Sequence, residues 1–310
     1  MKLSIIGSGN VGGLTAMRIL GYGFSKIILL DIQKNLAEAK ALDLEDSGSV
    51  YKYNYDIEAT SDIQRIESSQ LIIITAGFSR KPQMTREELL EKNAKIIKDL
   101  VYPIKKLCSE PIVIVVSNPV DILTYLFIKE SGFSSKRVFG IGPNLDSARF
   151  ANLIHKELNI SPSEIEAMVI GSHGEGMIPL PRFTFIKGVP LNKFLDEERI
   201  KQIIDDTIKR GSRIVSLFGS GSAYFGPSAA IEQVVKSILK DEKHILGLSA
   251  YLSGEYGFRD LCIGVPCVLG KNGIEKIIEL ELNSEEKEKF LKSVDSINKQ
   301  KNLLKEYALL

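Results

Sequence analysis

Residues 2–13 read KLSIIGSGNVGG, a short apolar run that leads directly into a glycine-rich turn. The turn has the pattern GxGxxG, which is typical of a phosphate-binding loop when it joins a strand to a helix. Its first glycine permits the tight turn, the second lets the backbone approach a pyrophosphate, and the third lets the helix pack on the strand. The N-terminus of that helix offers free N–H groups and a partial positive charge. We therefore expect a dinucleotide to contact Gly7, Gly9, Asn10, Val11 and Gly12.

The next apolar run, KIILLD at residues 26–31, ends on an acidic residue, Asp31. A carboxylate at the end of the second strand accepts hydrogen bonds from a ribose diol and repels a 2′-phosphate, so it favours NAD over NADP. Two other interpretations stay open. A methyltransferase holds S-adenosylmethionine by a similar loop, and a glycine-rich turn followed by a surface aspartate also occurs without a ligand.

The first half of the chain repeats a short apolar run, a turn and a helical pattern. Several runs are apolar on successive residues, which suits a parallel sheet covered by helices on both faces. The repetition predicts a doubly wound α/β domain, the Rossmann fold. The expected strands are Lys2–Ile6, Lys26–Asp31, Leu71–Thr75, Ile112–Ser117 and Arg137–Ile141, with a more exposed one where Tyr51, Tyr53, Tyr55 and Ile57 alternate. The expected helices are Val11–Gly21, Lys34–Asp46, Thr85–Cys108, Pro119–Ser131 and Leu145–Leu158, and Phe78–Thr85 should be a loop.

The second half has the pattern of an α+β domain. Its expected strands are Glu164–Ile170, Phe183–Lys187, Cys262–Leu269 and Ile274–Glu281, and its expected helices are Asp196–Ser212, Ser228–Lys240 and Ser284–Tyr307. A chain of 310 residues predicts two domains. We place a nucleotide-binding domain over residues 1–143 and a substrate-binding and catalytic domain over residues 144–310. Since no linker rich in Gly, Ser or Pro separates them, the halves should share one body.

The composition excludes several classes of protein. A net charge of +1 gives no electrostatic reason to expect nucleic acid or an anionic membrane as partner. No apolar stretch reaches the roughly 18 residues that a membrane helix needs, and the N-terminal run is too short for a signal peptide. The cysteines, Cys108, Cys262 and Cys267, lie in apolar stretches without metal-ligand spacing, so we expect buried thiols, a cytoplasmic protein and no metal.

Four further segments follow in order: TAGFSRKPQMTR at 75–86, VSNPVD at 116–121, LDSARF at 145–150 and GSHGE at 171–175. With the glycine-rich loop, this set resembles the malate/lactate dehydrogenase family over essentially the whole chain. The resemblance implies NAD as cofactor and hydride transfer to or from a 2-hydroxy acid. It also implies contacts to NAD from Asn93, Val116 and Asn118. Residues 39–44, AKALDL, resemble a family segment on a helix that often lies between subunits.

Hydride transfer from a hydroxyl carbon needs a group that takes the hydroxyl proton, and histidine changes charge near neutral pH. His173 lies between glycines at the end of an apolar run, whereas His155 and His244 lie in charged, surface-like stretches. The resemblance implies that His173 is the catalytic base and that Asp146 pairs with it. A helix N-cap is an alternative role for Asp146, because it closely follows Pro143.

The resemblance also implies a set of substrate contacts. Arg149, one helical turn after Asp146, resembles the arginine that grips the substrate carboxylate, a task that suits its planar fork. Arg86 resembles the arginine that stabilises charge on the reacting oxygen. Asn118 and Ser222 resemble further residues of the substrate pocket. A solvated surface position is the alternative for both arginines, and an Asx turn or a flexible loop for the other two.

The prediction of which 2-hydroxy acid is the substrate depends on Arg80. Lactate dehydrogenases of this family typically have glutamine at the matching position, and malate dehydrogenases have arginine. A buried arginine would neutralise the second carboxylate of oxaloacetate, whereas pyruvate would leave it unpaired at a cost of roughly 3–5 kcal/mol. We therefore expect reversible oxidation of (S)-malate to oxaloacetate, with lactate or another 2-hydroxy acid as the alternative substrate and solvent exposure as the alternative for Arg80.

Two departures from the family pattern concern the loop rather than the reaction: Gln83 stands where glycine is common, and Glu175 where aspartate is common. An NAD-using glycosidase and a non-catalytic NAD-binding protein are the rival classes. The first needs a metal site, of which the sequence has no sign, and the second gives no reason to keep His173, Asp146 and the arginines together. We expect a small-molecule substrate, no nucleic acid or membrane partner, and a homodimer or homotetramer.

Overall fold

The computed structural model describes residues 1–79 and 84–310. Its first half is a parallel sheet in the order β3-β2-β1-β4-β5-β6, with matched registers such as Ile5 beside Leu29 and Ile73. This is the Rossmann strand order, so the predicted doubly wound domain is confirmed. The strands are β1 Lys2–Ile6, β2 Lys26–Leu30, β3 Ile57–Thr60, β4 Leu71–Ile74, β5 Ile112–Val115 and β6 Val138–Gly140.

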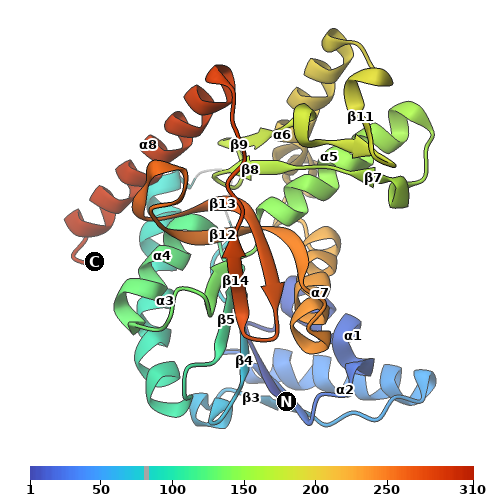
Figure 1. The fold of residues 1–310 in the computed structure, drawn as a ribbon. Helices are drawn as coiled ribbons and strands as arrows, with labels where there is room; N and C mark the ends of the chain where they lie inside the picture. Colours follow the sequence, from blue (N-terminus) through green and yellow to red (C-terminus); the bar gives the residue numbers. More distant parts are fainter. Residues whose placement is uncertain (80–83) are drawn as a thin grey trace.

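Helices cover both faces of this sheet (Figure 1). Successive strand residues alternate between two apolar clusters: Ile73 packs with α1, α2 and α7, while Ile72 and Ile74 pack with α3, α4 and α8. This double burial explains why the strands are apolar without a gap. The helices are α1 Asn10–Ile19, α2 Lys34–Tyr51, α3 Arg86–Leu107, α4 Val120–Ser131, α5 Pro143–Leu158, α6 Glu197–Phe218, α7 Phe225–Lys240 and α8 Ser284–Glu306. Short 3-10 helices span Leu20–Tyr22, Ile63–Ile66, Pro162–Glu164, Pro181–Phe183, Leu191–Lys193 and Glu255–Gly257.

The sheet does not stop at the sixth strand. β12 pairs antiparallel with β6 through Ser249 and Gly140, and the sheet continues as β12-β13-β8-β9, with β14 on β13. A separate three-stranded sheet, β11-β10-β7, packs with α5 and α6 around a third apolar cluster. The strands are β7 Ile165–Glu166, β8 Val169–Gly171, β9 Met177–Pro179, β10 Phe185–Ile186, β11 Val189–Pro190, β12 His244–Ser253, β13 Arg259–Gly270 and β14 Gly273–Ile277.

The tyrosine alternation at residues 51–57 was wrongly predicted as a strand. α2 runs on to Tyr51 and ends at Lys52 in the left-handed conformation, so only Ile57 belongs to a strand. Tyr55 packs against Gly48, where a Cβ atom would lie 2.5 Å from its ring, and its hydroxyl donates to the Glu45 carbonyl at 2.8 Å. Tyr55 therefore packs against and hydrogen-bonds to the C-terminal end of α2.

The second half differs from the sequence prediction in several places, and its short strands β9 and β11 were not predicted. The predicted strand 164–170 is split, because β7 belongs to the small sheet and β8 to the large one. β12, which no pattern predicted, crosses the middle of the large sheet. β12 has a glycine, Gly247, where Pro143 packs against it. A Cβ atom at Gly247 would lie 3.0 Å from the Pro143 ring, so a larger side chain would be crowded there. α6 extends to Phe218 and α7 begins at Phe225, so both are longer than expected.

The predicted domain boundary falls inside the first turn of α5, whose N-cap is Gly142. The three cysteines are buried and free of disulfides. Within residues 1–79 and 84–310, no helix is long and apolar enough to cross a membrane. The same residues contain no group of three or more His, Cys, Asp or Glu side chains placed to hold a metal ion.

Candidate active site

The glycine-rich turn forms a close-packed loop at the carboxyl end of β1. Gly7 has φ +104°, and a Cβ atom there would lie 2.5 Å from the Ala76 nitrogen. A Cβ on Gly12 would lie 2.0 Å from the Gly7 carbonyl oxygen. Only glycine fits either position. The loop therefore turns directly into α1, with Gly9 as N-cap and Asn10 and Val11 in the first turn.

The loop fits a dinucleotide on two observations. A Cβ atom on Gly9 would meet nothing within 4 Å, so the backbone is open to a ligand there. The Ser8 hydroxyl is buried, yet it has no hydrogen-bond partner among the described residues. Asp31 lies at the end of β2, where it accepts from the backbone N–H groups of Ser8 at 2.6 Å and Gln33 at 2.9 Å. A carboxylate thus stands beside the loop where the ribose of a dinucleotide is expected.

Asn93 ties together the ends of β4 and β5. Its Nδ2 donates to the carbonyls of Asn118 at 2.7 Å and Phe78 at 3.1 Å, and its Oδ1 accepts from the Phe78 N–H at 2.7 Å. Asn93 is buried, Val116 is half-buried and Asn118 is exposed at the carboxyl edge of the sheet. The side chain of Asn93 is therefore engaged within the protein, and it fixes the backbone at Asn118.

His173, Asp146 and Arg149 form one hydrogen-bonded group. His173 Nδ1 lies 2.7 Å from Asp146 Oδ2, and Arg149 Nη1 donates to Asp146 Oδ1 at 3.1 Å. The Asp146 side chain is 0% exposed, and those of Arg149 and His173 are 11% and 14% exposed. A Cβ atom on Gly142 would lie 2.7 Å from His173 Cβ, and one on Gly211 of α6 would lie 3.4 Å from Arg149 Nη1. A side chain at Gly142 would collide with the His173 ring, whereas one at Gly211 would lie in ordinary contact with Arg149.

The surroundings of His173 favour its charged form. Burial lowers its pKa, but the negative charge of Asp146 and the hydrogen bond to that carboxylate raise it, and the net pKa lies above the ordinary value of 6.5. Because Asp146 occupies Nδ1, the free ring nitrogen is Nε2. The ring can therefore take or give one proton at Nε2 near neutral pH.

The other two histidines lie elsewhere. His155 is near the end of α5, and its Nδ1 lies 2.7 Å from the Ile160 carbonyl, while His244 is exposed at the start of β12. The N-cap role weighed for Asp146 is wrong, because Gly142 caps α5 and Asp146 points to His173 and Arg149.

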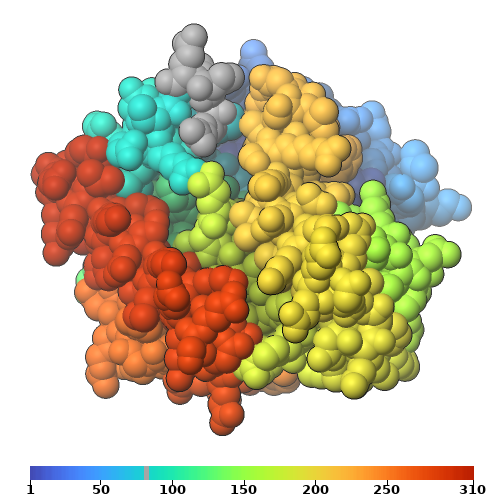
Figure 2. Space-filling model, turned by 90° about the horizontal axis from the view of Figure 1, so that it is seen from above, coloured from blue at the N-terminus to red at the C-terminus, as the bar shows by residue number. Residues whose placement is uncertain are grey.

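Two predicted substrate residues are exposed, and one of them, Arg86, is linked to the loop that carries His173. Arg86 opens α3, is 58% exposed and forms an ion pair with Glu175, two residues after His173. Ser222 is exposed in the loop between α6 and α7. Figure 2 shows a recess between the cyan surface of α3 and the gold surface near the end of α6. Arg80 and Gln83 lie outside the described residues, so the roles predicted for them stay predictions.

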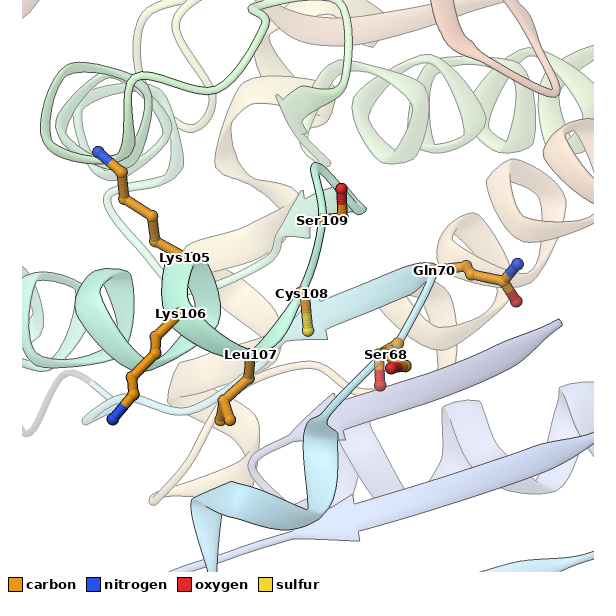
Figure 3. Close-up of a pocket in the computed structure, with 8 residues that line it drawn as sticks. Ser68, Gln70, Lys105, Lys106, Leu107, Cys108 and Ser109 are labelled. Atoms are coloured by element: carbon orange, nitrogen blue, oxygen red, sulfur yellow. The ribbon is translucent and has the colours of Figure 1, made fainter.

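A second hollow lies at the opposite, amino edge of the sheet. It measures about 530 Å³ and is lined by residues 68–70 and 105–109. Lys105 and Lys106 point away from each other at its rim (Figure 3). The Cys108 thiol donates to the Ile66 carbonyl, and burial raises its pKa. This hollow has neither a convergent charged group nor a reactive thiolate, so the carboxyl edge is the candidate site.

Two family domains match the chain one after the other. The NAD binding domain of lactate/malate dehydrogenases matches residues 1–140, and their alpha/beta C-terminal domain matches residues 143–308. The chain belongs to the lactate/malate dehydrogenase family. The predicted family, its NAD-binding domain and its fold class are thereby confirmed.

Individual members of the lactate/malate dehydrogenase family are similar over nearly their whole length. The chain is 44% identical to malate dehydrogenase of Methanosarcina acetivorans, covering 96% of this chain and 97% of that protein. The structure of Cryptosporidium parvum malate dehydrogenase matches with a TM-score of 0.94 at 37% identity, covering 100% and 99%. Lactate dehydrogenase of the same organism, solved with lactic acid and NAD, matches with a TM-score of 0.94 at 33% identity, covering 98% of each chain.

Beside this family site lies a residue that the sequence analysis did not single out. Asp121, in the first turn of α4, accepts from the His173 backbone N–H at 2.8 Å and from the Ser249 hydroxyl at 2.6 Å. A signal existed, because Asp121 is the one acidic residue within a stretch of α4 that is otherwise buried and uncharged from Val120 to Ile128. Ser249 carried no such signal, since β12 itself was not predicted.

Proposed function

We propose that this chain is an NAD-dependent malate dehydrogenase, which interconverts (S)-malate and oxaloacetate. The observation that carries the proposal is the buried pair of His173 and Asp146, 2.7 Å apart and joined to Arg149. The pair supplies a proton-transfer group next to a cation that suits a carboxylate. The similarity to malate dehydrogenases supports malate more than lactate as substrate.

Bound NAD would supply the hydride acceptor for the oxidation of malate. The residues proposed to hold it are those of the glycine-rich turn, Asp31, Val116 and Asn118, and Asn93 acts through the backbone of Asn118 that it fixes. The open space over Gly9 and the unpartnered Ser8 hydroxyl support a dinucleotide there. Asp31 favours a free ribose diol over a 2′-phosphate.

In the oxidation of malate, neutral His173 accepts the hydroxyl proton at Nε2. Asp146 keeps Nδ1 protonated, fixes the ring orientation and stabilises the imidazolium that forms. Arg149 grips the carboxylate next to the reacting carbon, a task that suits its planar guanidinium. In the reverse direction, His173 begins protonated and gives the proton back.

Arg86 is proposed to stabilise negative charge on the reacting oxygen. In the structure its guanidinium is paired with Glu175 at the rim of the site. Both side chains are exposed, so water weakens their attraction and the pair is easily exchanged for another partner. Arg86 therefore has to leave Glu175 to reach the substrate oxygen.

The raised pKa of His173 predicts the direction of the pH dependence. Malate oxidation needs the neutral ring, so kcat/KM for malate should fall as the pH drops through the His173 pKa, with half-maximal activity above pH 6.5. Reduction of oxaloacetate needs the protonated ring and should fall as the pH rises through the same pKa. Initial rates across pH with saturating cofactor measure both limbs. A malate limb centred below pH 6.5 would contradict the proposed base.

Arg80 is proposed to pair with the second carboxylate of malate. We expect Arg80→Gln to lower the ratio of kcat/KM for oxaloacetate to that for pyruvate by roughly a hundredfold or more, because a pairing worth about 3–5 kcal/mol is lost. The matched control is Arg65→Gln, a cation paired with Glu58 beside β3. If the ratio stays at the wild-type value, Arg80 does not select the substrate.

We also propose a compartment, a pathway and an oligomeric state. The protein would be a cytoplasmic enzyme of the tricarboxylic acid cycle that forms a homodimer or homotetramer. Self-association is supported by the apolar side of a hollow between α1, α2 and α7. Leu14, Met17, Leu44 and Phe225 line that side, and Asn10, Lys40, Asp43 and Ser47 add polar groups. Light scattering would give the assembly size, and a monomer would contradict this assignment.

A further inference from the structure

We propose that Asp121 is a positioning residue that sets both the place and the proton affinity of His173. Its effect on turnover rests on the function proposed above, whereas its effect on the ring does not. Asp121 lies three residues after Asn118, at the start of the helix that follows β5. Residues 118–121 would thereby hold two parts of the site in a fixed relation: Asn118, which is proposed to contact NAD, and the loop that carries His173.

The geometry ties three segments to one carboxylate. Asp121 is 5% exposed, and its two oxygens accept from the His173 backbone N–H at 2.8 Å and from the Ser249 hydroxyl at 2.6 Å. His173 lies in the loop after β8, and Ser249 lies where β12 pairs with Gly140 of β6. The side chain therefore links the start of α4, the junction of the two sheet halves and the loop that carries the ring.

The loop needs such an anchor. Gly171, the last residue of β8, and Gly174 have φ values of +87° and +97°, so the backbone on both sides of His173 adopts a conformation that favours glycine. The His173 N–H donates to a side chain instead of a backbone carbonyl. Because a buried N–H without a partner is unfavourable, the carboxylate keeps the loop in the observed conformation.

A buried carboxylate also acts on the ring through its charge. The charged and titratable groups that interact with Asp121 are His173, Asp146 of α5 and Cys262 of β13, while Arg149 acts on the His173 ring. Burial raises the pKa of Asp121 to about 6, although the bonds from Ser249 and the His173 N–H oppose the rise. Above that pH, Asp121 adds a second negative charge beside the imidazolium and raises the pKa of His173.

The test compares the His173 pKa in the wild-type protein and in Asp121→Asn. NMR titration of the ring signals is direct, because the chain has three histidines, and His155→Gln and His244→Gln assign the other two. Asparagine keeps the size and an oxygen acceptor but removes the charge. We expect the His173 pKa to fall by about half a unit or more, with the malate limb moving to lower pH by the same amount and kcat falling about tenfold.

The matched control is Asp260→Asn on β13. That carboxylate also bonds to α4, through Tyr125 at 3.0 Å and Lys129 at 3.1 Å, but it forms neither a hydrogen bond nor an ion pair with His173. It should leave the His173 pKa unchanged. If Asp121→Asn does not fold, Ser249→Ala replaces it: the loss of one donor raises the Asp121 pKa further, so the His173 pKa should shift downward by a smaller amount.

Two results would overturn the inference. One is a His173 pKa in Asp121→Asn equal to that of the wild type, whether or not turnover falls, because a loss of turnover alone would mean general damage. The other is the same pKa shift in Asp260→Asn. A wild-type protein that does not oxidise malate would contradict the proposed function, while the NMR titration would still decide the role of Asp121.

Discussion

His173→Asn is expected to lower kcat by roughly 10²–10⁴-fold in both directions, the range for loss of a general acid–base group. The asparagine side chain cannot accept the hydroxyl proton, so the hydride leaves from a carbon whose oxygen stays protonated. NADH affinity should stay at the wild-type value, because the glycine-rich loop and Asp31 lie at the ends of other strands. Stopped-flow turnover and NADH fluorescence titration measure the two quantities.

The matched control for this variant is His155→Asn. His155 lies near the far end of α5, the helix that carries Asp146, and its ring bonds to the Ile160 carbonyl. It should keep wild-type turnover. Near-normal kcat in His173→Asn would remove His173 from the reaction.

Arg149→Lys is expected to lower kcat/KM for oxaloacetate by roughly a hundredfold, mostly through KM. Lysine keeps the charge but loses the planar fork that binds a carboxylate through two N–H groups. The side chain is 11% exposed beside Gly211, so water compensates poorly for the missing donor. Steady-state kinetics with oxaloacetate measures the split between KM and kcat.

Arg210→Lys is the matched control for Arg149→Lys. Arg210 of α6 donates to the Asn152 side chain of α5 at 3.2 Å, so it joins the same two helices without touching Asp146. It should keep kcat/KM. An equal loss in both variants would point to disturbed packing of α5 on α6, and an unchanged KM in Arg149→Lys would refute the carboxylate grip.

The nucleotide-binding half could be predicted because its signals are local. Gly7 and Gly12 occupy positions that only glycine fits, and the apolar runs around Ile5 and Ile73 are unbroken because helices cover both faces. The tyrosines at 51–55 were wrongly predicted as a strand because tyrosines at every second position occur both in strands and in clusters that cover a helix end. Residue spacing does not distinguish the two.

The site was less accessible to sequence reasoning. Asp146 and His173 are 27 residues apart, and only the family resemblance joined them before the structure placed them at 2.7 Å. The bond between Asp121 and Ser249 spans 128 residues and depends on β12. That strand is rich in small residues because other elements pack closely on it, and such packing is a tertiary property.

One assay decides whether the chain reduces a 2-keto dicarboxylate in preference to pyruvate. NADH absorbance is followed with wild-type protein and either oxaloacetate or pyruvate at matched concentrations. We expect a kcat/KM for oxaloacetate at least a few hundredfold above that for pyruvate, from a pairing worth about 3–5 kcal/mol. Equal rates, or a preference for pyruvate, would refute the proposed function.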